Sequence, residues 1–365
     1  MSGSTETKKL TDKVQKLSSQ NSLMDWIGSF GSENIGVDIG TSHVVMYVKH
    51  KGIVFSEASV IAKNEMTREY FTFGTKAEAM EGRCPKEIQI YHPMKHSAIV
   101  DYNGAAYLLN SIVNQSYLKN MFFHPRLMMC VPTGINSVQR RALLEAAVAM
   151  GARKTVLIDQ PLAAVMGLGL ANGKSIGSMI VDIGGGSTKI AVLSQNGVVV
   201  SHLSYESGIE MDEAIVASIR DKYHVRIGKK EAESLKVALG ASWDLDRAPK
   251  VAETCGLSIV SGYPVKMAVT GEDVAHALNP VLYKIFKNIR DVIQRTPPAL
   301  LAAIREEGIW LIGGGAQLLG LEELVTKVTG IPAHVAKRPS YVNAIGAGMS
   351  LDYINEFRDS LQDLH

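Results

Sequence analysis

One short motif occurs twice in this sequence, and the repeat limits the fold more than any other feature. In "VDIGGGSTKIAVLS" an apolar strand ends at Asp182, glycines and hydroxyls follow, and a second apolar run begins. "VDIGTSHVVMYV" has the same order around Asp38, 144 residues earlier. Because a strand-like run follows each turn, whereas a dinucleotide-binding turn opens into a helix, each motif is expected to be a β-hairpin. Two copies of one hairpin predict a duplicated α/β fold, with one copy in each of two lobes.

The residue types in both turns suit the binding of phosphate. Glycines let backbone N–H groups approach phosphate oxygens closely, and hydroxyls can donate to the same oxygens. A carboxylate repels phosphate, so Asp38 and Asp182 need a cation beside the ligand, and Mg²⁺ accepts one or two carboxylates while it keeps most of its waters. For either copy taken alone, a hairpin turn without any ligand is the alternative. The candidate phosphate-binding residues are Gly40, Thr41, Ser42, Gly184, Gly185, Gly186, Ser187 and Thr188.

Two further stretches are candidates for contact with the rest of a nucleotide. In "GIWLIGGGAQLLGLEEL" a strand ends in Gly313, Gly314 and Gly315 and a helix is expected to begin, which would let the backbone lie flat against a base or an α-phosphate. "EAESLKVALG" places Glu233 and Lys236 three residues apart on one helix face. A solvated ion pair is the alternative for these two side chains.

The bulk properties exclude several classes of protein. A chain of 365 residues is expected to form two domains or lobes. A net charge of +2 gives no strong field for nucleic acid, and no nucleic-acid partner is expected. The sequence has no window of 18 or more uncharged apolar residues, so no transmembrane helix is expected. The N-terminus has no apolar signal core. The 3 cysteines form no metal-binding pattern, so a cytoplasmic location is expected.

The order of several stretches resembles the bacterial MreB family of the actin superfamily. The resemblance covers roughly residues 35–351, and it is carried by "VDIGTS", "GIVFSEASVIA", "HPMKHSAIVDY", "QPLAAVMGLGL", "VDIGGGSTKIAVLS", "MDEAI", "RTPPALLAAI" and "LIGGGAQLLGL". It implies an actin-like ATPase fold, in which two duplicated lobes with four subdomains surround a cleft for ATP or ADP. It also implies nucleotide-dependent assembly into homopolymer filaments that serve cell shape or a related task such as motility or organelle positioning.

The resemblance also assigns roles to particular residues. Asp38 and Asp182 match the two aspartates that face Mg²⁺ through water. Gly208 and the three glycines from Gly313 match backbone approaches to the nucleotide, and Glu233 and Lys236 match the pair that flanks the adenosine. Gln160 matches the residue that orients the attacking water. Most relatives carry glutamate there, and a glutamine can position water but cannot accept its proton, so slow hydrolysis is expected.

Other departures mark a divergent member of the family. His43 replaces the usual asparagine, Ile209 the usual aspartate, and Ile312 the usual threonine before the glycines. His96 and Ser97 replace the usual Asp-Gly after "PMK".

Two apolar segments are candidates for contact with the inner face of the cell membrane, where a peripheral location is expected. One helical stripe is formed by Leu23, Trp26, Ile27 and Phe30, and four lysines precede it in the sequence. Apolar residues beside basic ones are typical of an interfacial helix. The apolar loop Met121, Phe122 and Phe123 precedes a predicted strand, and the resemblance implies that it lies on the membrane-facing side. A cap docked on the first lobe and a buried turn are the respective alternatives. Membrane proteins of the shape or wall machinery and paralogous filament proteins are further candidate partners.

The expected division of the chain follows from these assignments. It is a disordered tail with a short amphipathic helix over residues 1–31, a first lobe over 32–170 with a small subdomain near 63–99, a second lobe over 171–338 with a small subdomain near 209–270, and a return to the first lobe over 339–365.

Other proteins of the same superfamily are the functional alternatives. A sugar kinase would need a catalytic aspartate in a sugar cleft, and the sequence offers no candidate. A chaperone ATPase would need a C-terminal substrate domain, and the sequence given ends at His365. A structural filament without turnover is a third alternative, because of Gln160.

Overall fold

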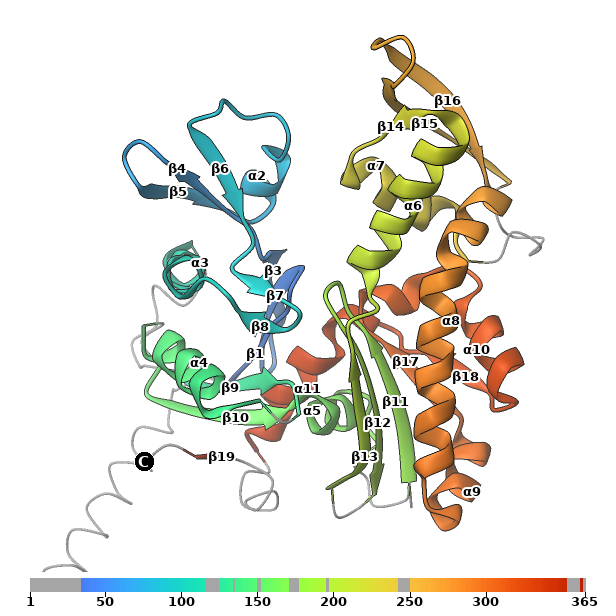
Figure 1. Ribbon diagram of the computed structural model, residues 1–365. Coiled ribbons are helices and arrows are strands. Elements are labelled where there is room, and N and C mark those ends of the chain that lie inside the picture. The colour runs from blue at the N-terminus through green and yellow to red at the C-terminus, as the bar shows by residue number, and fades with distance from the viewer. Residues whose placement is uncertain are drawn as a thin grey trace, which may run out of the picture.

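The structure is a computed structural model of the chain. It describes residues 34–115, 125–133, 135–149, 152–170, 177–194, 197–241, 250–352 and 362–363. In Figure 1 the chain forms two lobes that stand side by side, the first in blue and green and the second mainly in yellow and orange.

The first lobe is built on a 6-stranded sheet. In spatial order its strands are β3 (Gly52–Ala58), β2 (His43–Val48), β1 (Asn34–Ile39), β9 (Arg126–Val131), β10 (Lys154–Asp159) and β19 (Gln362–Asp363).

The second lobe is built on a 5-stranded sheet. In spatial order its strands are β13 (Gly197–Ser204), β12 (Thr188–Ser194), β11 (Gly177–Ile183), β17 (Ile309–Ile312) and β18 (Ala333–Val335).

The two sheets share one topology. In the first lobe β1, β2 and β3 form an antiparallel run, while β9 lies parallel to β1 and β10 parallel to β9. In the second lobe β11, β12 and β13 form the same antiparallel run, and β17 and β18 continue the sheet in parallel from β11. The predicted duplicated α/β fold is therefore confirmed. Both predicted hairpins are present, as β1–β2 (the first hairpin) and β11–β12 (the second hairpin).

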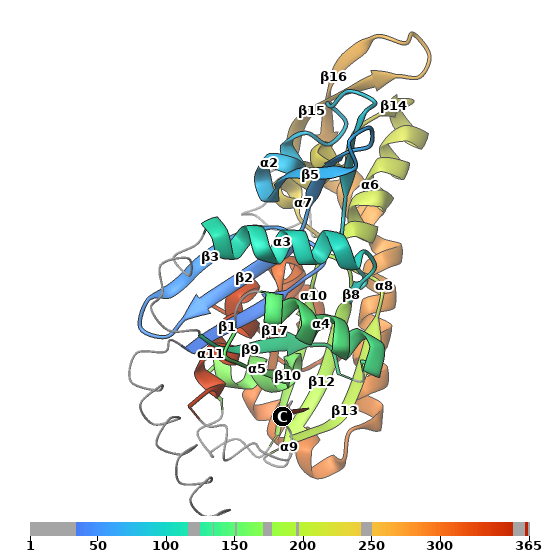
Figure 2. The same ribbon diagram turned by 90° about the vertical axis from the view of Figure 1, so that its left-hand side faces the viewer.

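Each lobe carries a smaller sheet at its upper end (Figures 1 and 2). In the first lobe this sheet is accompanied by helix α2 (Gly74–Ala79), and a two-stranded ribbon lies below it. The strands are β4 (Ile61–Asn64), β5 (Glu69–Phe73) and β6 (Ile88–Tyr91), the ribbon β7 (Met94–Lys95) and β8 (Ala98–Ile99), and in the second lobe β14 (Val225–Arg226), β15 (Val251–Ser258) and β16 (Pro264–Thr270). The subdomain boundaries given above stay a prediction.

Helices cover the sheets. Those of the first lobe are α3 (Tyr102–Gln115) and α4 (Ser137–Ala149), and those of the second are α6 (Gly208–Tyr223), α7 (Lys229–Leu239), α8 (Gly271–Arg295), α9 (Pro298–Glu307) and α10 (Leu321–Thr329). The central strands are buried on both faces, as the unbroken run "SMIVDI" in β11 indicates. Each lobe therefore has its own core, with Met46 and Leu127 in the first and Val181 and Ile285 in the second.

Helix α8 begins with a reciprocal cap. Thr270 Oγ1 accepts from the backbone N–H of Asp273 at 3.2 Å, and the Asp273 carboxylate accepts from the backbone N–H of Thr270 at 3.3 Å. The same carboxylate also accepts hydrogen bonds from Lys222 and Tyr223 at the end of α6. Asp273 therefore joins two helices of the second lobe.

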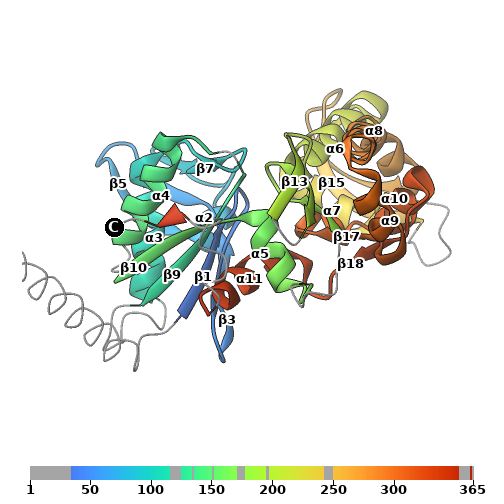
Figure 3. The same ribbon diagram turned by 90° about the horizontal axis from the view of Figure 1, so that it is seen from below.

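Two short helices, α5 (Gln160–Gly167) and α11 (Val342–Ser350), cross between the lobes (Figure 3). They touch through glycine backbone. A Cβ atom on Gly346 would lie 1.7 Å from the carbonyl oxygen of Ala163, and one on Gly167 would lie 2.2 Å from that of Val342. Only residues without a side chain allow this approach.

Over the part of the chain that the structure describes, no helix combines the length and the apolar character needed to cross a membrane.

Candidate functional site

A cavity of about 410 Å³ lies between the two lobes, and we call it the cleft. Its size is within the range of small-molecule sites. Nearly all of the predicted site residues line it, and they come from both hairpins, the starts of α5 and α6, helix α7 and the turn after β17. They are Asp38, Gly40, Thr41, Ser42, Gln160, Asp182, Gly184, Gly185, Gly186, Ser187, Gly208, Glu233, Lys236, Gly313, Gly314 and Gly315.

Thr188 is the exception. It is fully buried, it does not line the cleft, and its hydroxyl donates to the backbone oxygen of Glu206 at 2.6 Å. Side chains alternate along a strand, and the next residue in β12, Lys189, faces the cleft. The predicted contact of Thr188 with phosphate is therefore corrected.

The two hairpin turns are closed in the same way. Gly40 N–H donates to His43 O at 2.9 Å, and Gly184 N–H donates to Ser187 O at 2.9 Å. The turns also approach each other across the cleft, because a Cβ atom on Gly185 would lie 1.8 Å from the Ser42 hydroxyl oxygen. The glycines thus bring two sets of backbone N–H groups and hydroxyls to one place.

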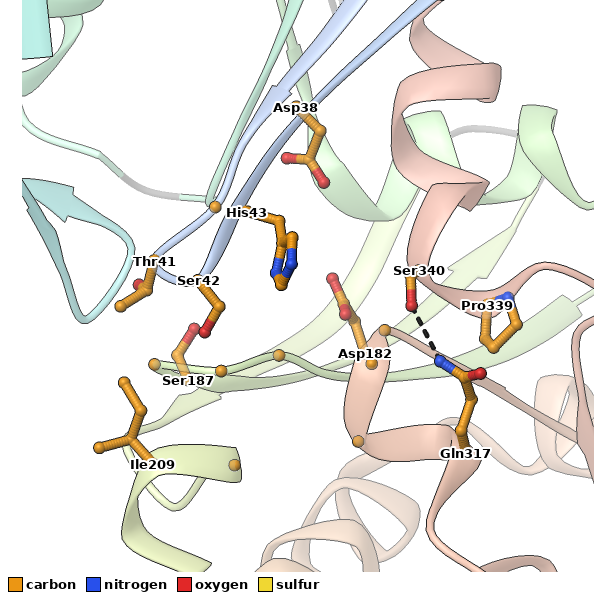
Figure 4. Close-up of a pocket in the computed structure, with 18 of the residues that line it drawn as sticks. Asp38, Thr41, Ser42, His43, Asp182, Ser187, Ile209, Gln317, Pro339 and Ser340 are labelled. Atoms are coloured by element: carbon orange, nitrogen blue, oxygen red, sulfur yellow. Dashed lines mark hydrogen bonds between the residues drawn. The ribbon is translucent and has the colours of Figure 1, made fainter. Parts of the chain in front are cut away.

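The two aspartates face each other at the base of these turns. In Figure 4 the carboxylates of Asp38 and Asp182 point toward one another across the cleft, with His43 beside the gap. Gln160 Nε2 donates to Asp38 Oδ1 at 3.0 Å, and Asn343 Nδ2 donates to Asp182 Oδ2 at 3.0 Å. Burial raises the pKa of Asp38, and the negative charge of Asp182 raises it further, although Lys189 opposes both. A positive charge entering between them would be stabilised.

Gln160 stands at the first residue of α5, next to the buried strand β10. Its side chain is only 4% exposed, and its Oε1 has no hydrogen-bond partner among the described residues. The Oδ1 atom of Asn343 is likewise buried without a partner in the described part of the chain. Two unused acceptors beside two carboxylates are what a site for water and a hydrated ion requires.

Another part of the cleft wall is built around Lys236 on α7. Its ammonium lies 2.7 Å from Asp212 Oδ1 on α6 and donates to the backbone oxygen of Gly208 at 3.1 Å. Burial raises the pKa of Asp212 and outweighs the opposing charge of Lys236, so that the resulting pKa is about 6. Lys236 therefore has its partner on a neighbouring helix rather than in Glu233, although Glu233 also lines the cleft.

The third glycine cluster follows β17, as expected, and opens a short 3₁₀ helix, η2 (Gly314–Gln317). Gly313 has a φ of +82°, and a Cβ atom there would lie 2.5 Å from Asp182 Oδ1. Its N–H donates to the oxygen of Pro339, at the start of η3 (Pro339–Tyr341). Gln317 Nε2 donates to Ser340 Oγ at 3.0 Å, as Figure 4 shows.

Several cleft residues were not found from the sequence as site residues. Ser97, Lys189, Asp212 and Asn343 all line the cleft. For Ser97 the departure from Asp-Gly in the β7–β8 turn was a signal, but Asn343 reaches Asp182 from 161 residues away, and no local pattern indicates that contact.

The site suits a hydrated Mg²⁺ better than a metal enclosed by protein. Within the described ranges, no group of three or more His, Cys, Asp or Glu side chains could hold a metal. Two carboxylates with free acceptors beside them match an ion that keeps its waters.

The predicted membrane segments, Leu23 to Phe30 and Met121 to Phe123, lie outside the described residues.

Comparison with known proteins gives consistent matches over most of the chain. The family model described as MreB/Mbl protein matches residues 32–359. The cell shape-determining protein MreB of Escherichia coli (strain K12) is 36% identical over 330 residues, covering 89% of this chain and 94% of that protein. The cell shape-determining protein Mbl of Bacillus cereus (strain ATCC 10987 / NRS 248) is 35% identical over 324 residues, covering 89% and 97%.

Solved structures give the same picture. MreB 5 of Spiroplasma citri bound to AMPPNP superposes with a TM-score of 0.84 at 28% identity, covering 90% of this chain and 98% of that one. The MamK double helical filament matches with a TM-score of 0.73 at 20% identity, covering 87% and 98%, which supports the fold alone. The predicted actin-like fold is confirmed.

Proposed function

The chain belongs to the MreB/Mbl protein family, and from this membership and the geometry of its cleft we propose that it binds and slowly hydrolyses ATP and assembles into filaments at the inner face of the cell membrane. One observation carries the nucleotide part of the proposal. Two equivalent glycine turns and two facing aspartates, one of each from each lobe, meet in a single cavity. The Spiroplasma citri MreB 5 structures, which are bound to AMPPNP and to ADP, support it.

The residues of the cleft have different roles in the proposed binding and hydrolysis of ATP. Backbone N–H groups of the two hairpin turns bind phosphate oxygens, helped by the hydroxyls of Thr41 and Ser187. Asp38 and Asp182 would hold Mg²⁺ through its waters, and the bound ion would neutralise charge on the phosphates. Gln160 uses its Nε2 on Asp38, which leaves Oε1 to accept from the attacking water. Because an amide cannot take up the proton, turnover is slow.

The test is binding and turnover in Asp182→Asn, which keeps the size of the side chain but removes its charge. We expect Mg²⁺-dependent hydrolysis to fall by about a hundredfold or more, the usual scale for one electrostatic group of an active site. The matched control is Asp352→Asn, which removes a carboxylate that pairs with Lys49 away from the cleft. Unchanged turnover in Asp182→Asn would overturn the assignment of the cleft.

Filament assembly from identical subunits needs two complementary surfaces on one chain. The hairpin loop between β15 and β16 offers one candidate, because Val260 is 84% exposed and Tyr263 is 73% exposed. In Figure 1 this loop is the outermost point of the second lobe. A role in cell shape or a related task is supported by the relatives, which are cell shape-determining proteins.

Membrane attachment is proposed from the sequence alone, through the stripe Leu23, Trp26, Ile27 and Phe30 and the loop Met121 to Phe123. Burial of one large apolar side chain contributes about 1.5–3 kcal/mol at best, so each anchor is weak in a monomer. Polymerisation multiplies weak anchors, and binding should rise steeply with it. Co-sedimentation with liposomes tests this, using a chain without residues 1–31 that also carries Phe122→Ser and Phe123→Ser. If this variant polymerises and still pellets with lipid as the parent does, these segments are not the anchors.

A further inference from the structure

Lys189 breaks the symmetry of the duplicated hairpins at the residue opposite the aspartate. In the second hairpin Asp182 of β11 pairs with Lys189 of β12. In the first hairpin the equivalent pair is Asp38 and Val45. Directly opposed residues of an antiparallel pair project from the same face of the sheet, so Lys189 reaches the cleft where the first lobe presents only an aliphatic side chain.

The ammonium of Lys189 is largely shielded from solvent, and Asp182 does not complete its hydrogen bonds. Its side chain is 12% exposed, and Nζ lies 3.7 Å from Asp182 Oδ2. That distance fits an ion pair but is too long for a hydrogen bond, so the N–H groups of Lys189 are not saturated by Asp182. An ammonium that is largely shielded from solvent is costly unless an acceptor completes its hydrogen bonds.

The spaces around Lys189 show where such an acceptor could lie. Lys189, Gln160 and Asp182 line both the cleft and an adjoining small cavity of about 10 Å³, and this space suits about one water molecule. The lysines among the described residues that line the cleft are Lys189 and Lys236, and Lys236 is already paired with Asp212. Lys189 is thus the cleft lysine that pairs with one of the two facing aspartates.

We propose that Lys189 is a phosphate-binding residue that supplies part of the positive charge otherwise provided by the divalent metal, so that this chain binds nucleotide with a reduced dependence on Mg²⁺. The inference rests on the proposed nucleotide binding, and it adds a residue and a property to that site. The carboxylates of Asp38 and Asp182 together carry a charge of −2, and the ammonium of Lys189 reduces the net charge around the metal position to −1.

The experiment compares the dissociation constant of a fluorescent ATP analogue in Mg²⁺ and in EDTA. We expect Lys189→Met to weaken binding in EDTA by about tenfold or more, as the loss of one charge-assisted hydrogen bond predicts, and to weaken it less in Mg²⁺. Lys189→Arg should restore the affinity in EDTA. Lys236→Met is the matched control, since it removes a cleft cation that pairs with Asp212 rather than with an aspartate of the metal position, and it should weaken binding equally in both conditions.

The outcomes separate the two proposals. Failure of the unaltered protein to bind the analogue in Mg²⁺ would overturn the proposed function and this inference with it. Normal binding in Mg²⁺ combined with an unchanged affinity of Lys189→Met in EDTA would overturn only the role of Lys189. If Lys189→Met does not fold, the unaltered protein still decides, because a complete loss of its affinity in EDTA contradicts the inference.

Discussion

The hydroxyl oxygens of Ser97 and Ser187 lie 2.6 Å apart, although the two residues are separated by 90 positions in the chain and belong to different lobes. The contact comes from the β7–β8 turn, whose two central residues, His96 and Ser97, have φ values of +49° and +62°. His96 Nδ1 also lies 3.1 Å from the oxygen of Gly186. A strained turn of the first lobe therefore holds the glycine turn of the second hairpin, between Gly184 and Ser187.

Substitutions at Ser97 should separate strain from bonding. Ser97→Gly and Ser97→Ala both lose the hydroxyl, but only alanine must keep a Cβ atom at positive φ. We expect Ser97→Ala to be less stable than Ser97→Gly by about 1 kcal/mol. Thermal unfolding of the two variants measures this difference. Equal melting temperatures would mean that the turn relaxes to another conformation when the bridge is lost.

Gln160→Glu should raise ATP turnover by about tenfold or more, because a carboxylate can accept the proton of the attacking water. It should also lower the melting temperature, since the hydrogen bond that Gln160 donates to Asp38 would be replaced by a repulsion. Steady-state phosphate release is the measurement. Gln317→Glu is the control, because Gln317 is an amide on the wall of the cleft that bonds to Ser340 instead. A loss of ATP affinity in Gln160→Glu without a change in turnover per bound ATP would make Gln160 a binding residue.

Asp273 should make stability depend on acid pH. Burial raises the pKa of this carboxyl, but hydrogen bonds from Lys222, Tyr223 and Thr270 outweigh burial and hold the pKa well below its usual range. Its contribution is therefore present above the unfolded pKa of about 4 and is lost as the pH falls toward the folded value. At pH 7 we expect Asp273→Asn to cost about 2–3 kcal/mol, from the cap and the bonds to Lys222 and Tyr223.

Melting temperatures of the unaltered protein and Asp273→Asn between about pH 7 and pH 3 test this expectation. The difference between the two curves should be constant above about pH 5 and should begin to narrow below about pH 4, where the carboxyl of the unfolded chain takes up its proton. Parallel curves over the whole range would show that the carboxylate charge is not what stabilises the start of α8.

Val260→Asp should impair polymerisation without unfolding the protein. A charge on the outermost loop of the second lobe would be desolvated in a subunit contact, and we expect the critical concentration to rise by at least about threefold. Sedimentation with Mg·ATP measures it. Val148→Asp on α4 is the control, because Val148 is also well exposed, at 71%. An equal effect of both substitutions would indicate a loss of solubility rather than a lost contact.

The sequence was most informative where function requires a local pattern. The repeat around Asp38 and Asp182 predicted both hairpins, because strand alternation, glycine and carboxylate all lie within a few residues. It failed for Thr188, since the type of a residue does not reveal which face of a strand it occupies. The partner of Lys236 was also missed. Asp212 lies on another helix, and the packing of α6 against α7 is a tertiary property.

The contact between α5 and α11 also has a mechanical consequence. Preferred angles between helices come from side-chain ridges that fit into grooves, but where Gly346 meets Ala163, and Gly167 meets Val342, backbone faces backbone. At these two points no interlocked side chains fix the angle between the helices, so a small relative rotation would not have to separate such side chains there. The two small sheets, β4–β6 and β14–β16, lie at the ends of the lobes that are far from this contact (Figure 1). A small rotation between the lobes, set by the ligand bound in the cleft, would therefore move these small sheets by a larger distance. Such a movement would change their contacts with a neighbouring subunit.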